Sequence, residues 1–191
     1  MTKYILAGGR IDKSLDEGKA FVEELIAGFD KRVQVLVCPF ARKREEWQSC
    51  LEGDQEFFSK FTANFELVLA DPAIFTEQVK NTDVIFFRGG YPEPLLALLK
   101  LSSDWINYSE GKTVAGTSAG AEILAKYYSV SKNGRIGEGL GVLPIKFSPH
   151  WLSTTGDYVG VNWEERMDQL RAHQEDLPMV LLKEGEFQVF M

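Results

Sequence analysis

The sequence predicts an α/β fold in which helices cover both faces of a mostly parallel central sheet, a three-layer sandwich. Short apolar runs alternate with longer amphipathic stretches through the first two thirds of the chain. The early strands are separated by no hairpin signal, and several of them end in glycine pairs or proline. This alternation is typical of parallel strands joined by helical crossovers. Sites in such folds lie where the carboxyl ends of the strands meet.

The alternation begins with a strand at residues 4–7, which stops at Gly8-Gly9, and a helix at residues 19–29. Pro39 closes the second strand and Arg88-Gly89-Gly90 stops the fourth. Pro92 falls in the first turn of its helix, where proline is tolerated. The other strands are expected at residues 33–37, 65–69, 84–87 and 113–115, and the other helices at residues 44–61, 73–80, 92–101 and 119–127.

After Tyr127 the alternation breaks. Residues 128–149 are rich in glycine and turn-prone, as in Lys132-Asn133-Gly134, and predict a hairpin and a loop. A further helix is expected at residues 163–173, and two strands at residues 179–182 and 187–190. No repeat or linker divides the chain, so residues 1–191 are expected to form a single domain. The last strand stops at Met191, which leaves a shortened C-terminus open.

Composition excludes several classes of function. Hydrophobic residues make up 45% and charged residues 26% of the chain, as in ordinary globular proteins. The net charge of −7 disfavours nucleic acid and anionic membranes as partners. Cys38 and Cys50 lack the spacing of a disulfide framework or a zinc site, and no G-x-G-x-x-G motif follows the first strand. We therefore expect a cytoplasmic protein without metal or cofactor, present as a monomer or homodimer.

The strongest motif is Gly116-Thr117-Ser118-Ala119-Gly120, which fits the G-x-S-x-G pattern of a nucleophile elbow. It follows an apolar strand and opens a helix, which is the context that the pattern requires. The serine of such a turn occupies a strained conformation, and its neighbours must be small to avoid the strand and the helix. Ser118 is therefore expected to be a nucleophile at a helix N-terminus, where the dipole favours developing negative charge.

A serine nucleophile also needs an oxyanion hole and a general base. Glycine lets the backbone approach a substrate closely, so the N–H groups of Gly90 and Ala119 are the expected oxyanion donors. His150 is the expected base, because His173, the second of the two histidines, lies in a charged helix end. A carboxylate should orient the base. Composition alone does not choose among the candidates Glu184, Asp157, Glu164, Glu165 and Glu138.

Three segments together resemble a known family. Phe87-Arg88-Gly89-Gly90, Gly116 to Ala121 and Ser148-Pro149-His150-Trp151 look like the S51 serine peptidases, which include dipeptidase E and cyanophycinase. The resemblance implies the class I glutamine amidotransferase-like fold with a flavodoxin-like core. It also implies that Ser118 attacks a peptide carbonyl, that His150 is the base and that Glu184, in a late E-G turn, is the third member.

The resemblance further implies hydrolysis of small peptides, with N-terminal Asp-X dipeptides as a candidate substrate. Arg166, three residues after Trp163, is the nearest match to the arginine that holds an aspartyl side chain in the family. The chain departs from dipeptidase E at Tyr91-Pro92, where an asparagine often follows the glycine pair. The expected substrate-binding residues are Gly89, Tyr91, Thr117, Trp151 and Arg166.

Two other functions remain open. The same three groups could hydrolyse an ester or a non-peptide amide. A non-catalytic binding or sensor protein on the same fold would be favoured if Ser118 and His150 lay too far apart for a hydrogen bond, or if Tyr91-Pro92 plugged the site.

Overall fold

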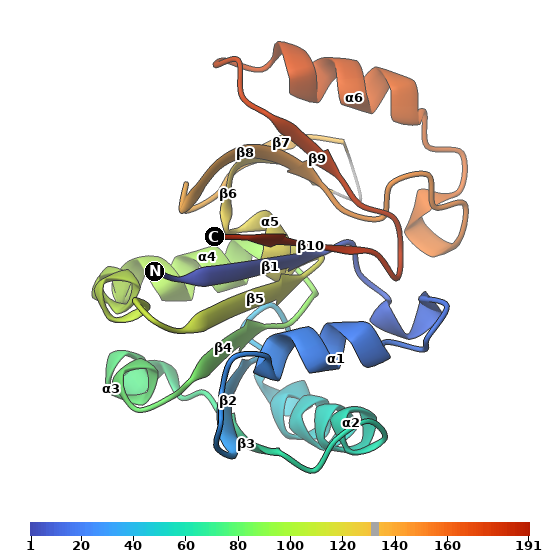
Figure 1. Cartoon of the computed structure of the whole chain (residues 1–191). Helices are drawn as coiled ribbons and strands as arrows, with labels where there is room; N and C mark the ends of the chain where they lie inside the picture. The colour runs from blue at the N-terminus through green and yellow to red at the C-terminus, as the bar shows by residue number, and fades with distance from the viewer. Residues whose placement is uncertain (131–133) are drawn as a thin grey trace.

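The computed structural model describes residues 1–130 and 134–191, and its larger sheet has the order β10-β1-β5-β4-β2-β3 (Figure 1). All neighbouring strands pair in parallel except β10, which runs antiparallel along β1. The α/β fold with a mostly parallel sheet is therefore present. The strands are β1 (Lys3–Ala7), β2 (Val33–Cys38), β3 (Phe65–Leu69), β4 (Val84–Phe87), β5 (Thr113–Thr117) and β10 (Phe187–Phe190).

Helices cover both faces of this sheet (Figure 1). Successive side chains of a strand point to opposite faces. Along β1, Ile5 belongs to the same buried apolar cluster as side chains of α1 and α2, whereas Leu6 belongs to the cluster that includes α3 and α4. The two clusters therefore place α1 on one face and α3 and α4 on the other, and α2 contributes Phe58 to the first cluster and Trp47 to the second. These helices are α1 (Lys19–Ile26), α2 (Trp47–Ser59), α3 (Phe75–Lys80) and α4 (Pro92–Leu101).

The second half of the chain adds a smaller sheet of order β7-β6-β8-β9. In it β6, β8 and β9 are parallel, and β7 is antiparallel to β6. Tyr128, Phe147 and Val180 join its strands to the apolar cluster that also contains α3 and α4. Helix α6 lies on the outer side of this sheet (Figure 1). The elements are β6 (Ala125–Ser129), β7 (Ile136–Glu138), β8 (Leu143–Ser148), β9 (Met179–Leu181) and α6 (Trp163–Ala172).

Two sequence-based expectations for this region are wrong. The helix expected at residues 119–127 ends early, because α5 covers only Ala119–Glu122 and β6 follows. Tyr127 and Tyr128 are buried and pair with β8, a setting that favours aromatic residues in strands. The loop expected within residues 128–149 instead contains β8, although β6 and β7 do form a hairpin. Lys132 and Asn133 of the predicted turn lie outside the described residues.

Within the described ranges the longest helix is α2, with 13 residues. None of the helices there has both the length and the apolar character needed to cross a membrane.

Replacing Gly120 with alanine should lower the free energy of unfolding by about 1–3 kcal/mol, the usual cost of overpacking. A Cβ at this position would lie 2.0 Å from the carbonyl oxygen of Phe87 in β4. Gly53→Ala in α2 is the matched control, because its Cβ would meet nothing within 4 Å. Alanine should there raise stability by up to ~1 kcal/mol. Urea denaturation measures both, and wild-type stability of Gly120→Ala would contradict this packing.

Candidate active site

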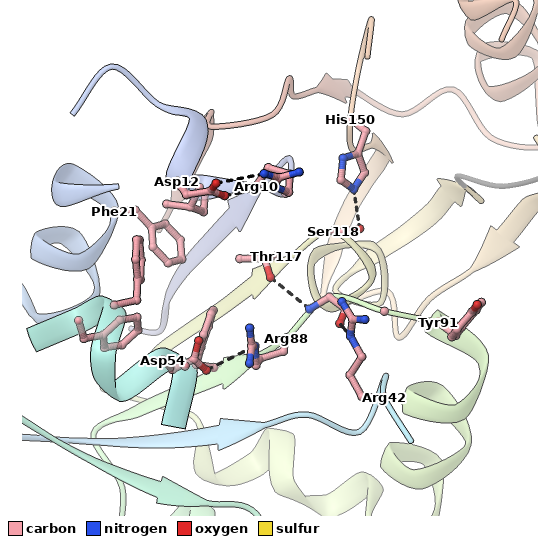
Figure 2. A pocket seen from close by; sticks show the side chains of 18 of the residues that line it. Arg10, Asp12, Phe21, Arg42, Asp54, Arg88, Tyr91, Thr117, Ser118 and His150 are labelled. Carbon is pink, nitrogen blue, oxygen red and sulfur yellow. Dashed lines mark hydrogen bonds and ion pairs between the residues drawn. The ribbon is translucent and has the colours of Figure 1, made fainter. Parts of the chain in front are cut away.

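The loops that follow β1, β4, β5 and β8 meet beside a cavity of about 600 Å³. The carboxyl ends of parallel strands are where open α/β sheets bind ligands. Ser118 and His150 lie on its wall, together with the glycine-rich loops after β1 and β4. Figure 2 shows the side chains of Ser118 and His150 pointing toward one another, with Arg10 and Arg42 on either side of Ser118.

Ser118 occupies the turn between β5 and α5 with φ 49° and ψ −116°, a conformation that few non-glycine residues adopt. A Cβ on Gly116 would lie 2.2 Å from the carbonyl oxygen of Gly120. The flanking glycines of the motif are therefore required by close packing of the strand, the turn and the helix. The turn is held to β1 by a hydrogen bond from the Ser118 N–H to the carbonyl of Ala7, at 3.0 Å.

His150 follows β8 in a positive-φ conformation, with φ 53°. Its Nε2 lies 2.9 Å from the Ser118 Oγ. His150 is buried, with 8% of the residue exposed, and its ring stacks on that of Tyr158 with centroids 4.7 Å apart. A Cβ on Gly9 would lie 2.3 Å from the imidazole Cε1, so glycine after β1 makes room for the ring.

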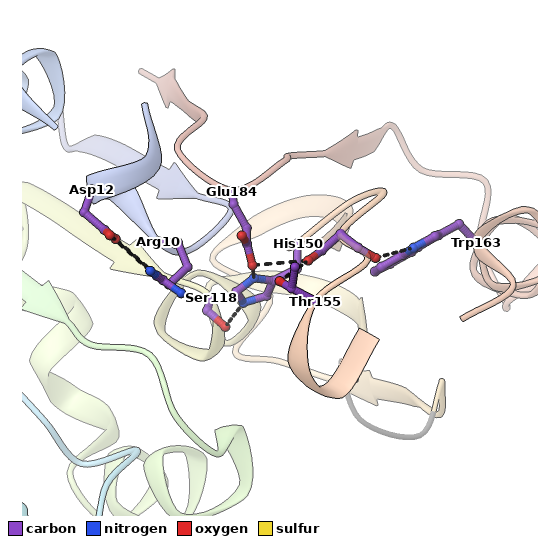
Figure 3. A network of polar contacts seen from close by, with 8 residues as sticks. Arg10, Asp12, Ser118, His150, Thr155, Trp163 and Glu184 are labelled. Carbon is purple, nitrogen blue, oxygen red and sulfur yellow. Dashed lines mark hydrogen bonds and ion pairs between the residues drawn. The ribbon is translucent and has the colours of Figure 1, made fainter. Parts of the chain in front are cut away.

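Glu184 lies on the opposite side of the imidazole from Ser118, with its Oε1 3.1 Å from His150 Nδ1 (Figure 3). A carboxylate only accepts hydrogen bonds. Nδ1–H therefore donates to Glu184, and Nε2 is left to accept from the Ser118 hydroxyl. Ser153 Oγ donates a further hydrogen bond to the same oxygen of Glu184, at 3.3 Å.

Among the carboxylates that the sequence left open, Glu184 is the one that the structure places against His150 Nδ1. Asp157 lies on the cavity wall. Glu164 and Glu165 fall in the first turn of α6, and Glu138 ends β7.

Burial lowers the pKa of His150 below its ordinary value of 6.5, because the charged imidazolium loses solvation. The hydrogen bond and the negative charge of Glu184 oppose this effect, and the positive charge of Arg10 adds to it. A lowered pKa keeps the imidazole neutral near pH 7. His150 is thus able to accept a proton from Ser118.

The expected oxyanion donors are the backbone N–H groups of Gly90, in the loop after β4, and Ala119, directly after Ser118. Within the described chain, the N–H groups of Gly90 and Ala119 donate no hydrogen bond to the protein. A Cβ on Gly89 would lie 3.2 Å from the Ser118 Cβ, so the loop after β4 runs directly past the serine. The Gly89 N–H itself donates to Thr117 Oγ1 at 3.2 Å, which holds the loop in place.

The expected substrate-binding residues fall into two groups. Gly89, Tyr91 and Thr117 line the cavity. Trp151 and Arg166 instead pack on Trp163. The ring centroids of Trp151 and Trp163 are 5.4 Å apart, and Arg166 Cζ lies 5.4 Å from the Trp163 ring centroid. The part of all five in substrate binding stays a prediction.

Sequence reasoning missed several residues at the cavity: Arg10, Asp12, Arg42, Asp54 and Tyr158. Arg10 and Asp12 form a two-pronged ion pair with both N–O distances at 3.2 Å. Arg10 follows the glycine pair after β1, so its place at a strand end could have identified it. Tyr158 lies in an irregular loop and Asp54 on a helix, where neither motif nor periodicity distinguishes them from surface residues.

Among residues 1–130 and 134–191, no three histidine, cysteine or acidic side chains are grouped to hold a metal ion. Asp54 faces Arg88, Asp12 pairs with Arg10, and Glu184 faces His150. Cys38 and Cys50 are both free thiols.

Comparison with known proteins gives one family and a set of similar folds. The family model described as Peptidase family S51 matches residues 5–190. No curated protein sequence matches the chain. A crystal structure of a peptidase from an acI-B1 Actinobacterium has 19% identity and a TM-score of 0.69, with 100% of this chain and 83% of that chain covered. A putative peptidase E protein from Listeria monocytogenes EGD-e has 16% identity and a TM-score of 0.71, with 100% and 97% covered. At these identities the two structures show a shared fold.

The imidazole of His150 should titrate with a midpoint below the ordinary value of 6.5, because burial outweighs the effect of Glu184. Glu184→Gln should lower the midpoint further, since a neutral amide removes the negative charge that favours the imidazolium. NMR titration of imidazole resonances measures both, and a His173→Asn variant identifies the signal of the other of the two histidines. A midpoint that stays or rises in Glu184→Gln would show that the carboxylate does not act on this ring.

Proposed function

The chain belongs to peptidase family S51, and on this premise we propose that it is a serine peptidase that cleaves small peptides through an acyl-enzyme formed on Ser118. One observation carries the proposal. Ser118, His150 and Glu184 form a continuous series of contacts, 2.9 Å and 3.1 Å long, at the wall of an open cavity. This is the arrangement of nucleophile, base and orienting carboxylate.

In the proposed mechanism, His150 Nε2 takes the proton of Ser118 as Oγ attacks the peptide carbonyl. The N–H groups of Gly90 and Ala119 stabilise the oxyanion of the tetrahedral intermediate, each worth about 3–4 kcal/mol in comparable sites. His150 then donates its proton to the leaving amine. Water repeats the cycle on the acyl-enzyme and releases the acid. Glu184 holds the imidazole in the required tautomer throughout.

The geometry argues against a non-catalytic binding protein. Such a protein would be favoured by a long separation between Ser118 and His150 or by a plugged site. The two side chains instead lie 2.9 Å apart. Tyr91 is 51% exposed at the cavity edge and leaves about 600 Å³ open.

The cavity suits a short substrate, because sites of this volume bury most of a ligand of a few hundred daltons. We propose a peptide over an ester because peptide hydrolysis is the chemistry of the family. Preference for N-terminal aspartate depends on a cation in the cavity. Arg166 packs on Trp163, whereas Arg10, Arg42 and Arg88 line the cavity.

Ser118→Ala should lower kcat by at least ~10⁴, because removal of the nucleophile from such a triad leaves only binding and oxyanion stabilisation. The measurement is amine release from short peptides varied at the first residue, with parallel ester substrates and fluorophosphonate labelling. Ser49→Ala on the exposed face of α2 is the matched control and should retain wild-type rates. Faster turnover of esters than of every peptide would point to an esterase. Failure of every substrate and of the label would leave a binding protein.

Gly90→Ala should lower kcat by about 10²–10³, the usual loss when one oxyanion donor is displaced. A Cβ here would lie 2.2 Å from the Ala41 carbonyl oxygen, so the loop must shift and carry its N–H away from Ser118. Gly111→Ala, at a positive-φ glycine whose Cβ would meet nothing within 4 Å, controls for loss of glycine. Steady-state kinetics with one good substrate decide the point, and an unchanged kcat in Gly90→Ala would remove this N–H from the mechanism.

A further inference from the structure

Beyond Ser118 the cavity reaches a polar pair that the proposed chemistry does not use (Figure 2). Asp54 comes from α2 and is 6% exposed, and Arg88 follows β4. Arg88 Nε lies 3.4 Å from Asp54 Oδ2, and Arg88 Nη1 donates to the carbonyl of Cys50 at 2.7 Å. Both side chains line the cavity, and the contacts to α2 hold the guanidinium in place.

The carboxyl of Asp54 lacks the partners that a buried acid ordinarily has. Within the described chain its Oδ2 is buried and accepts no hydrogen bond, so the contact with Arg88 is an ion pair without hydrogen-bond geometry. Desolvation raises the pKa of Asp54 to about 7, and the charge of Arg88 opposes this. Leaving a buried polar group unpaired costs free energy. Because Asp54 lines the cavity, a ligand donor that reached this carboxyl would remove that cost.

Four phenylalanine side chains also line the cavity. They are Phe21 of α1, Phe57 and Phe58 of α2, and Phe86 of β4. The rings contact one another, with centroids of Phe21 and Phe86 6.0 Å apart and those of Phe58 and Phe86 5.9 Å apart. A ligand group here thus meets apolar walls and, at one place, a carboxyl beside a guanidinium.

The polar pair selects the kind of group that fits. A cationic side chain would be attracted by Asp54 but repelled by Arg88, and an anionic one would be attracted by Arg88 and repelled by ionised Asp54. A neutral hydroxyl can donate to Asp54 and also accept from Arg88, whose contacts with Asp54 and Cys50 use Nε and Nη1. The phenylalanine walls favour an aromatic body over a short polar one.

We propose that this region is a specificity subsite for a phenol, the side chain of tyrosine, in the peptide whose cleavage at Ser118 is proposed above. The subsite rests on that proposed function but is built from different residues. Asp54 and Arg88 recognise the hydroxyl, and the phenylalanine side chains pack on the ring.

The test compares peptides that differ only in one residue, tyrosine, phenylalanine, aspartate or arginine, placed on either side of the scissile bond in turn. In the wild-type protein kcat/KM should be at least about tenfold higher for tyrosine than for phenylalanine at one of these positions, as expected for a hydrogen bond to a charged group. In Asp54→Ala the tyrosine to phenylalanine ratio should fall to about one. Asp168→Ala removes an exposed acid that is likewise paired with an arginine, Arg171, and should keep the wild-type ratio.

A binding measurement separates the subsite from the chemistry. N-acetyltyrosinamide and N-acetylphenylalaninamide are titrated into the Ser118→Ala protein, with and without Asp54→Ala, and followed by calorimetry. Tighter binding of the tyrosine amide only where Asp54 is present supports the subsite even if no peptide is cleaved, in which case the proposed function alone fails. Equal binding of the two amides, or cleavage that prefers aspartate or arginine, overturns the subsite. Should Asp54→Ala fail to fold, the wild-type ratio of tyrosine to phenylalanine decides alone.

Discussion

The end of β1 is the constraint on which the site depends, because three backbone hydrogen bonds join it to the three segments that carry Ser118, His150 and Glu184. The N–H of Ser118 donates to the carbonyl of Ala7 at 3.0 Å. The N–H of His150 donates to the carbonyl of Gly8, and the N–H of Gly185 to the carbonyl of Gly9, both at 2.9 Å. No side chain fits at the glycine pair. A Cβ on Gly8 would lie 2.1 Å from the Lys183 carbonyl oxygen, and one on Gly9 would lie 2.3 Å from the imidazole of His150. One strand end thus sets the relative positions of residues that are far apart in sequence.

This arrangement also explains how two strained residues are maintained. Ser118 and His150 have φ values of 49° and 53°. A positive φ costs each non-glycine residue about 1–3 kcal/mol of conformational free energy. The hydrogen bonds from both backbones to β1 and the close contact of Gly116 with Gly120 oppose relaxation of these turns. In these backbone conformations, Ser118 Oγ and His150 Nε2 face each other at 2.9 Å. The same packing removes His150 from water, which lowers its pKa and keeps it neutral.

Local sequence predicted those parts of the molecule whose physical cause is local. The strands and helices up to residue 115 were found because buried strands and amphipathic helices have distinct periods. The serine turn was found because close packing admits only small residues around Ser118, and the structure brings His150 and Glu184, both selected from sequence, against it. In the second sheet, β9 and a hairpin were predicted, but the start of β6 and all of β8 were missed. Tyr127 and Tyr128 become a strand only through their partners in β8, which lie some twenty residues away. Asp54 was missed for the same reason, since a single acid on α2 has no meaning until Arg88 and the phenylalanine cluster surround it.

The proposed catalytic and specificity groups converge on the loop after β4. Arg88 is anchored to α2 through the Cys50 carbonyl, and it lies two residues before Gly90, the proposed oxyanion donor. Gly89 between them is held from both sides, its carbonyl accepting from Arg42 Nε at 2.7 Å and its N–H donating to Thr117 at 3.2 Å. A substrate side chain that engages Arg88 therefore acts on the same short segment that presents the Gly90 N–H to the reacting carbonyl. Interactions accelerate a reaction only where they are stronger in the transition state than in the ground state. Since the oxyanion exists only in the transition state and the intermediate, a loop that is already held in this position raises kcat rather than merely lowering KM.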